Sequence, residues 1–600
     1  MAINQNFNGA SLYKPGAYSQ TKVNLSGGFP LAATGVVAIV GEADAGAPGS
    51  SAGVQTYTSE DIASLISTYQ AGPIVDAARL LISPARDARV TNGASIIRVY
   101  KVNAATQATL ALKNAAPVTL LNITSANWGA DQNLISVKVE AGVVSASARI
   151  ITVQKGSQKE TLSENPYAAI LSIQYTGSGS ASTLTIQAGS LVTTCTGDTP
   201  SNLSIPLAGK TVQQLVDLID AHASYTCTTT LKLASSKLAS DLDPISTAAD
   251  IKTAAVVLRA QQKEMLDIIN GESTLITAAR VTDVEGTVAT SAKQFLSGAV
   301  RGAATNSSFQ AGFDALLAKR CNIVVPLVAR DASALAAEGL TDSTSTFTVD
   351  AVNLQALTHC ILASNTKNRS ERNCYVAKKT SFASAQSAAQ DLNHERASML
   401  IQDVEVLSST GDLVWQEPWA ASCLLAGIQA GTDVGTPATF KLINVNGIRH
   451  QDYNPKTQVD LAIAAGIIPL EEVDSGGFRV VVQNSTYSKD ANFVYNRPSV
   501  LAAADTVAYN LRQQLEAIFV GEKARTGSAE AIKNAVIAIM STMLSAELIV
   551  GDDTNNKLGW KDLTVTLNGN TAIVDITITP VQGIDFILNR ITLDSIRQSA

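Results

Sequence analysis

The sequence has few of the residues on which nucleic-acid binding depends. Only 16% of its 600 residues are charged, 5% are aromatic, and the formal net charge is -7 at pH 7. Proteins that bind nucleic acids need clustered lysine and arginine to neutralise the phosphates. The chain shows no such cluster, so its composition argues against a nucleic-acid partner.

Cysteines with metal-ligand spacing are also missing. None of the six belongs to a CxxC pair, the spacing typical of zinc sites. They stand at Cys195, Cys227, Cys321, Cys360, Cys374 and Cys423. An even number permits disulfides in an oxidising compartment, but for a protein folded in the cytoplasm we predict buried free thiols.

No apolar run reaches the roughly 20 residues that span a bilayer. The strongest stretch, residues 532–550, is interrupted by Lys533, Asn534 and Glu547. The first 18 residues contain neither the basic region nor the apolar core of a signal peptide. We therefore predict a soluble protein without membrane insertion, made and folded in the cytoplasm.

Motifs for phosphate or metal binding are absent. Gly35, Gly41 and Gly46 follow a predicted strand, but they form neither GxxxxGK[ST] nor GxGxxG and are interpreted as turn formers. The sequence around His394 lacks the second histidine of HExxH and is interpreted as a surface helix. The other histidines, at positions 222, 359 and 450, belong to no motif.

Acidic pairs do not suggest catalysis either. Glu471 with Glu472, and Asp552 with Asp553, are adjacent residues whose side chains point apart, so we interpret them as solvated charges. We predict no catalytic residue, no metal site and no cofactor. An active site assembled from distant segments stays an alternative.

What the sequence has is a large apolar content, 46% of 600 residues, which implies several folded domains. Pro15 and Gly16 make residues 1–30 an extended arm. A buried strand and a glycine-rich loop are predicted at 34–49, a helix capped by Thr58 or Ser59 at 58–69, and a strand at 93–102. This order of strand, helix and strand indicates an α/β layer.

Residues 103–250 form a β-rich insertion, since they are rich in Ser, Thr and Gly with period-2 patches. One helix is predicted inside it at 211–222, where apolar residues repeat at helical spacing. They are Val212, Leu215, Val216 and Ile219. The α/β pattern returns with a helix at 253–270, and a later helix precedes a fully buried strand at 321–328.

The C-terminal part is predicted to contain helices at 511–519 and 531–544, followed by a hairpin with Asn568 and Gly569 in a type I′ turn. Beyond the turn the sequence alternates, with Val574, Ile576 and Ile578 on one face and Asp575, Thr577 and Thr579 on the other. Apolar residues resume after Gly583. A terminal strand has an open edge with which another chain can pair.

Six stretches follow one another in a particular order along the chain: "YKPGAY", "GVVAIVGEADAGAPG", "ANWGADQNLISVKVE", "FLSGAVRGAATNSSFQAGFDALL", "WQEPWAASCLLAGIQAGTDVGTPATFKLINVNGI" and "AGIIPLEEVDSGGFRVVVQNSTY". Taken together, they resemble the contractile tail sheath proteins of bacteriophages and related injection machines. The resemblance covers about residues 13–586 and depends on the order of the stretches. The chain departs from the family at 483–486, where an Arg-Thr is common, and at Arg497, where the family has an arginine-rich stretch.

The resemblance implies an α/β and α+β multidomain fold: an inner α+β domain built from both chain ends, and an outer α/β domain carrying the β-rich insertion. The expected boundaries are an N-terminal arm at 1–30, the outer domain at 31–102 and 251–400, the insertion at 103–250, the inner, tube-facing domain at 401–582 and a C-terminal arm at 583–600.

The resemblance also implies a structural subunit of the virion, not an enzyme. Such a subunit polymerises as a helical homopolymer of stacked hexameric rings around the tail tube protein, between baseplate and tail terminator proteins. The array then contracts and drives the tube through the host envelope.

In this family the terminal arms add strands to neighbouring copies. The matching arm residues are Tyr13, Pro15, Tyr18, Ile584, Phe586 and Leu588. The alternative is that they cover the core of their own domain. Contact with the tube should need only a few charges. The candidates are Arg512, Lys523 and Arg525, and for each of them a solvated helix face is the alternative.

Two other classes of protein stay open: an α/β enzyme with a dispersed active site, and another repetitive assembly protein of a virion or an adhesin. An enzyme would be a small closed oligomer, whereas a sheath subunit would be a monomer or a very long tube.

Overall fold

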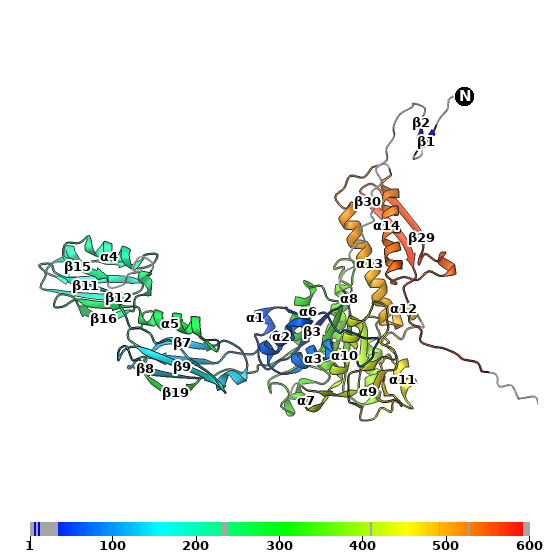
Figure 1. Cartoon of the computed structure of the whole chain (residues 1–600), viewed down its shortest axis with the longest axis horizontal. Coiled ribbons are helices and arrows are strands. Elements are labelled where there is room, and N and C mark those ends of the chain that lie inside the picture. The colour runs from blue at the N-terminus through cyan, green and yellow to red at the C-terminus, as the bar shows by residue number, and fades with distance from the viewer. Residues whose placement is uncertain are drawn as a thin grey trace, which may run out of the picture.

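The chain folds into several units (Figure 1). Two β modules lie at one end, an α/β body lies in the middle, and a C-terminal unit rises from this body. The computed structural model describes residues 5–7, 10–12, 34–229, 237–408, 411–490, 492–525 and 527–591. Within this part, none of the helices has the length and apolar character needed to span a bilayer.

The α/β body is built on a six-stranded sheet, in which five parallel strands are bordered by one antiparallel strand. In spatial order the strands are β22 (Ala397–Leu400), β21 (Asn373–Ala377), β20 (Ile323–Pro326), β3 (Val36–Gly41), β5 (Ile96–Lys101) and β4 (Gln55–Thr58). The strands predicted near 34–49, 93–102 and 321–328 are thereby confirmed. β3 and β20 are buried along their whole length, because helices cover both faces of the sheet.

Successive residues of β3 point into two different cores. Val37 and Ile39 pack against one set of helices, and Ala38 and Val40 pack against another. The first set consists of α2 (Ile62–Tyr69), α3 (Pro73–Ile82) and α10 (Pro418–Gly431). The second consists of α6 (Asn306–Leu317), α8 (Val349–Ala363) and α9 (Phe382–Leu392). Thr58 forms the predicted cap, on a 3-10 turn (Ser59–Asp61) that leads into α2.

The chain leaves the body after β5 and returns before α6, and a backbone hydrogen bond of 3.1 Å from Ala104 N to Ala303 O closes this neck. Next to the body lies the proximal β module. Its strands are β6 (Thr109–Lys113), β7 (Thr119–Ser125), β8 (Ser136–Ala141), β9 (Arg149–Lys155), β10 (Gln158–Thr161), β18 (Ile276–Arg280) and β19 (Ser291–Phe295). They form two sheets that share a core with α5 (Gln261–Glu272).

The distal β module is inserted within the proximal one and has a core of its own. Its strands are β11 (Ala169–Tyr175), β12 (Ala181–Gln187), β13 (Ser190–Thr196), β14 (Ser204–Pro206), β15 (Tyr225–Thr229), β16 (Ile245–Asp250) and β17 (Val256–Arg259). The predicted helix is present as α4 (Val212–Asp220), and its four apolar residues are buried in this core.

The β-rich region therefore extends beyond Asp250, where we had expected the α/β pattern to return. The stretch 253–270 is not one helix: it contains strand β17 and then α5, which covers the proximal module. The amphipathic pattern of a helix indicates that the helix covers a sheet, but the pattern does not indicate which sheet.

Residues 401–482 complete the α/β body and do not begin a new domain. Helix α10 is buried almost all round and contributes Trp419, Leu424 and Ile428 to the core beneath the large sheet. Two small sheets pack against the same core, whereas two short helices contribute to the core on the other face of the large sheet. Their strands are β23 (Asp403–Leu407), β24 (Leu413–Gln416), β25 (Leu442–Ile443), β26 (Gly447–Arg449), β27 (Leu470–Glu472) and β28 (Phe478–Val480). The helices are α7 (Ala332–Ala337) and α11 (Val459–Ala464).

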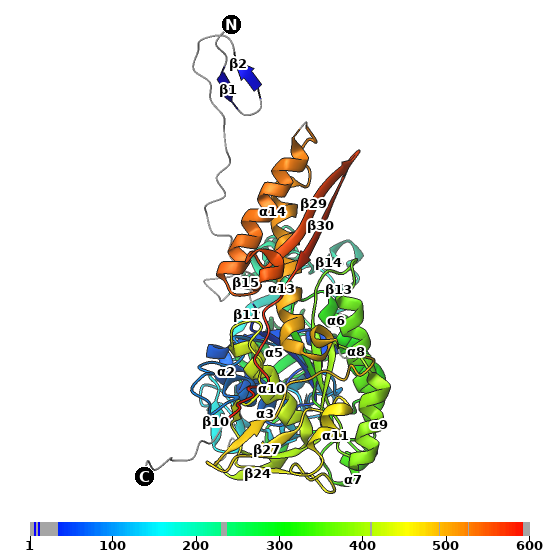
Figure 2. The same ribbon diagram turned by 90° about the vertical axis from the view of Figure 1, so that its right-hand side faces the viewer.

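The C-terminal unit follows the short helix α12 (Phe493–Asn496). It consists of two long helices, α13 (Pro498–Phe519) and α14 (Ser528–Ser545), and the hairpin of β29 (Trp560–Asn568) and β30 (Thr571–Ile578). The two predicted helices are confirmed as parts of α13 and α14. The unit has a core of its own, which includes Val507, Val536 and Trp560. Figure 2 shows the hairpin lying along α14.

At the N-terminus, β1 (Gln5–Phe7) and β2 (Ala10–Leu12) pair as an antiparallel hairpin, where we expected only an extended arm. The expected arm contacts Tyr13, Pro15 and Tyr18 lie outside the described residues.

All six cysteines are free and buried, as the sequence predicts. Burial raises the pKa of the Cys227 thiol to about 12 and also raises that of Cys423. Because only the thiolate reacts, a chromogenic disulfide reagent should detect almost no thiol in the native protein. All six should react after denaturation in guanidinium chloride. Rapid labelling of the native protein would contradict this burial.

Candidate functional site

The most unusual feature is that the hairpin of the C-terminal unit forms a sheet of two strands only. β29 and β30 pair from Trp560 with Ile578 to Asn568 with Thr571, and in the described part of the chain each strand has one unpaired edge. An isolated two-stranded sheet is marginally stable in water. The hairpin is thus a sheet to which further strands can be added.

The two faces of the hairpin differ in polarity. On β30, Val574, Ile576 and Ile578 pack against the core of the unit, whereas Asp575 and Thr577 are exposed. The predicted alternation is confirmed. The inward residues are only half-buried, however, because a sheet of two strands is too narrow to cover them.

The turn differs from the prediction by one residue. Its two loop residues are Gly569 and Asn570, because Asn568 is already paired with Thr571. Only Gly569 has a positive φ, of 59°. Positive φ at the first loop position alone is typical of a type II′ turn, whereas a type I′ turn needs it at both positions.

An open groove of about 420 Å³ lies beside the tip of the hairpin. Its apolar lining comes from the end of α13, the start of α14 and both strands. The apolar residues are Leu515, Phe519, Val520, Ile532, Leu567, Ala572 and Val574. Such a surface accommodates apolar side chains of an added segment.

The segment after β30 is anchored at its root. The backbone N–H of Val581 donates to Leu548 (3.1 Å), and Gly583 lies against Pro437. Asp585, whose side chain is only 8% exposed, forms an ion pair of 2.8 Å with Nε of Arg497. This arginine stands where the sequence resemblance had shown a departure, and its pairing with the C-terminal segment was not predicted.

Beyond the root, the segment exposes a dense series of large apolar side chains. They are Ile584, Phe586, Ile587, Leu588 and Ile591, and Leu588 is 93% exposed. In Figure 1 this red segment leaves the base of the C-terminal unit without joining a sheet. Our prediction named Ile584, Phe586 and Leu588 but missed Ile587 and Ile591, because it assumed strict alternation.

The three cationic candidates lie in two different places. Lys523 and Arg525 are exposed in the turn between α13 and α14. Arg512 instead faces the α/β body, where its guanidinium forms an ion pair of 2.8 Å with Glu371. Arg512 is therefore engaged within its own chain, while the other two are on the surface.

The histidines do not form a catalytic site. His359 is buried, and burial together with Arg372 lowers its pKa to about 3, so it is neutral and accepts a hydrogen bond from Arg372 (3.0 Å). His394 follows the end of α9 and does not lie on a surface helix as predicted, because Asn393 ends the helix with a left-handed φ of 34°. Among the described residues, no cluster of three or more His, Cys, Asp or Glu could hold a metal.

A charged crevice of about 570 Å³ lies at the carboxyl ends of β3 and β20, where open α/β sheets often bind ligands. Two of its arginines are paired with carboxylates of the same crevice: Arg301 with Glu42 (3.1 Å) and Arg330 with both Glu338 (2.6 Å) and Glu417. The crevice therefore shows a network of ion pairs rather than a nucleophile with its base.

Glu42 in this crevice gives a stability prediction. Burial raises its pKa, although a hydrogen bond from Thr341 and the charge of Arg301 oppose the shift. Because its pKa is higher in the folded state, Glu42 favours folding most below its unfolded pKa, and this contribution is lost as the pH rises through the folded pKa. Glu42→Gln should therefore not lower the melting temperature at pH 7. It should also remove the part of the pH dependence of the melting temperature that comes from Glu42.

The matched control is Glu42→Ala, which leaves Thr341 and Arg301 without this partner and should cost about 1–3 kcal/mol. Thermal unfolding between pH 4.5 and 7 compares the variants. Equal destabilisation by both substitutions would contradict the raised pKa that we assign to Glu42.

Comparisons with known proteins agree on one family. The chain is 26% identical to the tail sheath protein of Bacillus phage SP01, over 98% of this chain and 97% of that protein. No family model matches the chain.

Two crystal structures share the fold at 13% sequence identity. One is a sheath tail protein from Desulfitobacterium hafniense (TM-score 0.52, 94% of this chain and 100% of that one). The other is a sheath tail protein from Listeria innocua (TM-score 0.52, 92% of this chain and 93% of that one). The chain is therefore similar along almost its whole length to a phage tail sheath protein, and it shares the fold of two sheath tail proteins.

Proposed function

We propose that this protein polymerises into a helical sheath around a tail tube and that the C-terminal arm, residues 583–600, joins neighbouring copies. One observation carries the proposal: within the described residues, the arm exposes five large apolar side chains while the hairpin has two unpaired edges. Exposed apolar groups of this density are rare on monomers and are typical of association sites. Strand addition covers both features at once.

The occupant of the hairpin edge is proposed to be the arm of another copy. The pair of Arg497 and Asp585 holds the root of the arm at the base of the C-terminal unit, and the arm leaves away from its own hairpin (Figure 1). Main-chain hydrogen bonds of an added strand persist while the units that they join rotate. Such links let an array change shape without coming apart.

The same proposal assigns the remaining surfaces. Stacked hexameric rings would surround the tail tube protein, with baseplate and tail terminator proteins at the two ends. Lys523 and Arg525 at the α13–α14 turn are the candidates for contact with the tube, since a few exposed charges permit sliding. Contraction would lower the free energy of a metastable array and drive the tube through the host envelope.

Electron microscopy of the purified protein tests the assembly. A head-to-tail interface that does not close generates tubes, so we expect monomers together with long tubular polymers in negative stain. A small closed oligomer would contradict the proposal and favour the enzyme alternative.

The β modules are proposed to face outwards and to be dispensable for assembly. Because Ala104 and Ala303 are hydrogen-bonded neighbours, residues 105–302 can be replaced by a short Gly-Ser linker without separating the strands of the body. This variant should form tubes like the full chain and of smaller diameter. A folded variant that forms no tubes would show that the modules take part in assembly.

A further inference from the structure

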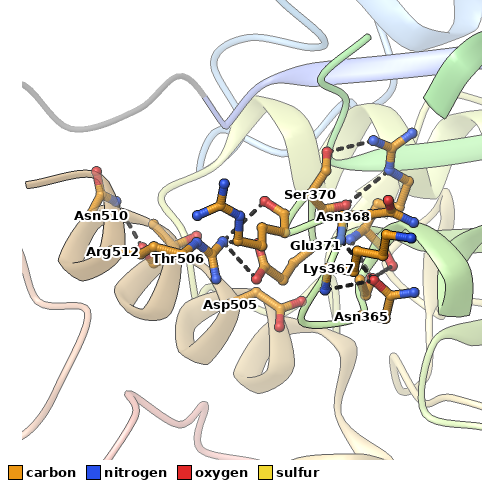
Figure 3. A network of polar contacts seen from close by, with 12 residues as sticks. Asn365, Lys367, Asn368, Ser370, Glu371, Asp505, Thr506, Asn510 and Arg512 are labelled. Carbon is orange, nitrogen blue, oxygen red and sulfur yellow. Dashed lines mark hydrogen bonds and ion pairs between the residues drawn. The ribbon is translucent and has the colours of Figure 1, made fainter. Parts of the chain in front are cut away.

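The contact between α13 and the α/β body is a stripe of charged and aromatic side chains. Asp505, Tyr509, Arg512 and Glu516 follow one another at spacings of four, three and four residues, so they lie on one face of the helix. Figure 3 shows Asp505 and Arg512 on this face, with Arg512 bonded to Glu371 in the loop after α8. We call these four residues the ionic stripe.

Each member of the stripe has its own partner in the body. Arg396 holds Asp505 with two bonds of 2.8 and 3.1 Å, and Arg369 pairs with Glu516. The guanidinium of Arg320 lies 3.4 Å from the centre of the Tyr509 ring. All the partners are charged residues.

The buried cores of the body and of the C-terminal unit do not merge. Among the described residues, the two cores of the body contain no buried residue beyond Val480, and the buried core of the C-terminal unit begins at Val507; the half-buried Val434 of the body packs against this second core from the side. Apolar residues at the start of α13, Val500, Leu501 and Ala503, are buried and fix that end of the helix. The helix is thus held by apolar contacts at its start and by charges farther along.

The ionic contact is also loosely packed. A cavity of about 40 Å³, large enough for water, lies between Arg320, Glu371, Asp505 and Tyr509. Burial raises the pKa of Asp505 even beside Arg396, which means that desolvation offsets much of their attraction. Desolvated ion pairs fix the orientation of two surfaces but stabilise their contact only weakly. The outermost pair, Arg369 with Glu516, is exposed enough for salt to screen it.

We propose that α13 is a joint: the C-terminal unit turns on the first turn of this helix, and the ionic stripe is the contact that holds it against the body or releases it. The ion pair of Arg497 with Asp585 lies directly before this pivot. Because Asp585 is held at the pivot, this part of the arm root moves less than the hairpin. The use of such a joint in a sheath rests on the proposed function, but its existence does not.

The test measures the distance between body and C-terminal unit in the free protein. Thr358 on α8 and Ser541 on α14 are exposed, and the native cysteines are buried, so Thr358→Cys with Ser541→Cys permits two spin labels. Pulsed electron resonance should give a wider distance distribution when NaCl rises from about 0.05 M to about 0.5 M. Amide exchange across residues 505–516 should rise about tenfold over the same range.

Three controls separate the joint from general loosening. A label pair within the body, Thr358→Cys with Ser387→Cys, should keep its width at both salt concentrations. Asp505→Asn with Arg512→Gln should widen the first distribution at low salt. Glu530→Gln with Lys533→Gln, which removes one charge of each sign from α14, should not.

The proposal of a joint is wrong if the distance distribution changes neither with salt nor with the double substitution Asp505→Asn and Arg512→Gln. This holds whatever the width of the distribution. The measurement uses the monomer, so it stays decisive if the protein forms no tubes. In that case the proposed function fails and the joint is judged separately.

Discussion

Removal of residues 585–600 should leave a folded, soluble monomer that forms no long tubes. The deletion takes away Phe586, Ile587, Leu588 and Ile591, and also Asp585, which holds the arm root to Arg497. Burying one large apolar side chain contributes about 1.5–3 kcal/mol, so an arm of this kind supplies on the order of 10 kcal/mol before ordering costs. Losing it should lower tube formation below detection in sedimentation velocity and negative-stain microscopy.

Two variants give this experiment its controls. Removing only residues 592–600 keeps every exposed apolar side chain described here and should leave some tube formation. Phe586→Ser with Leu588→Ser keeps the full length and the arm root, and should weaken assembly nearly as much as the deletion. Normal tubes from the deletion at residue 585 would show that the arm does not join the copies.

Arg372→Met should destabilise the α/β body by about 3 kcal/mol or more. Arg372 is 1% exposed and donates hydrogen bonds to the carbonyls of Leu316 (3.1 Å) and Lys319 (3.3 Å) and to His359. These bonds connect the end of α6 with α8 and with the start of β21. Methionine fills much of the volume but leaves the buried carbonyls without their donor.

Arg369→Met is the matched control, because it makes the same substitution three residues earlier at an exposed ion pair. Exposed pairs of this kind contribute about 0–1 kcal/mol. Denaturant unfolding followed by amide exchange in β20 and β21 reports on the body alone, which matters in a chain of several units. Equal effects of both substitutions would contradict the role given to Arg372.

Much of the local structure could be predicted from the sequence. The apolar runs of β3 and β20, the helical spacing in α4 and the alternation in β30 all record which sides of an element are buried. The family could also be recognised from ordered stretches of sequence. The division of the chain into units could not be predicted from the sequence. The apolar surfaces of α5 and α10 would suit any sheet, and only the folded chain shows which sheet each helix covers.

Only part of the candidate site was predicted from the sequence, because patterns of nearby residues are visible in a sequence and contacts between distant segments are not. The exposed apolar residues of the arm and the hairpin lie within about 30 consecutive residues, so their pattern is visible in the sequence. Arg497 and Asp585 are 88 residues apart, and Arg512 and Glu371 are 141 apart. A charge does not show its partner at such separations, and Arg512 was accordingly predicted to face a tube rather than its own chain.

By itself the sequence determined much of the secondary structure, the buried thiols and the similarity to phage tail sheath proteins, because periodicity and composition reflect burial next to neighbours in the chain. The tertiary structure decided which charges are paired, that Arg372 is inside, and that an ionic stripe separates the C-terminal unit from the body. These properties depend on groups brought together from distant segments, and the energy of a charge is set by the partners and the solvent that the fold leaves around it.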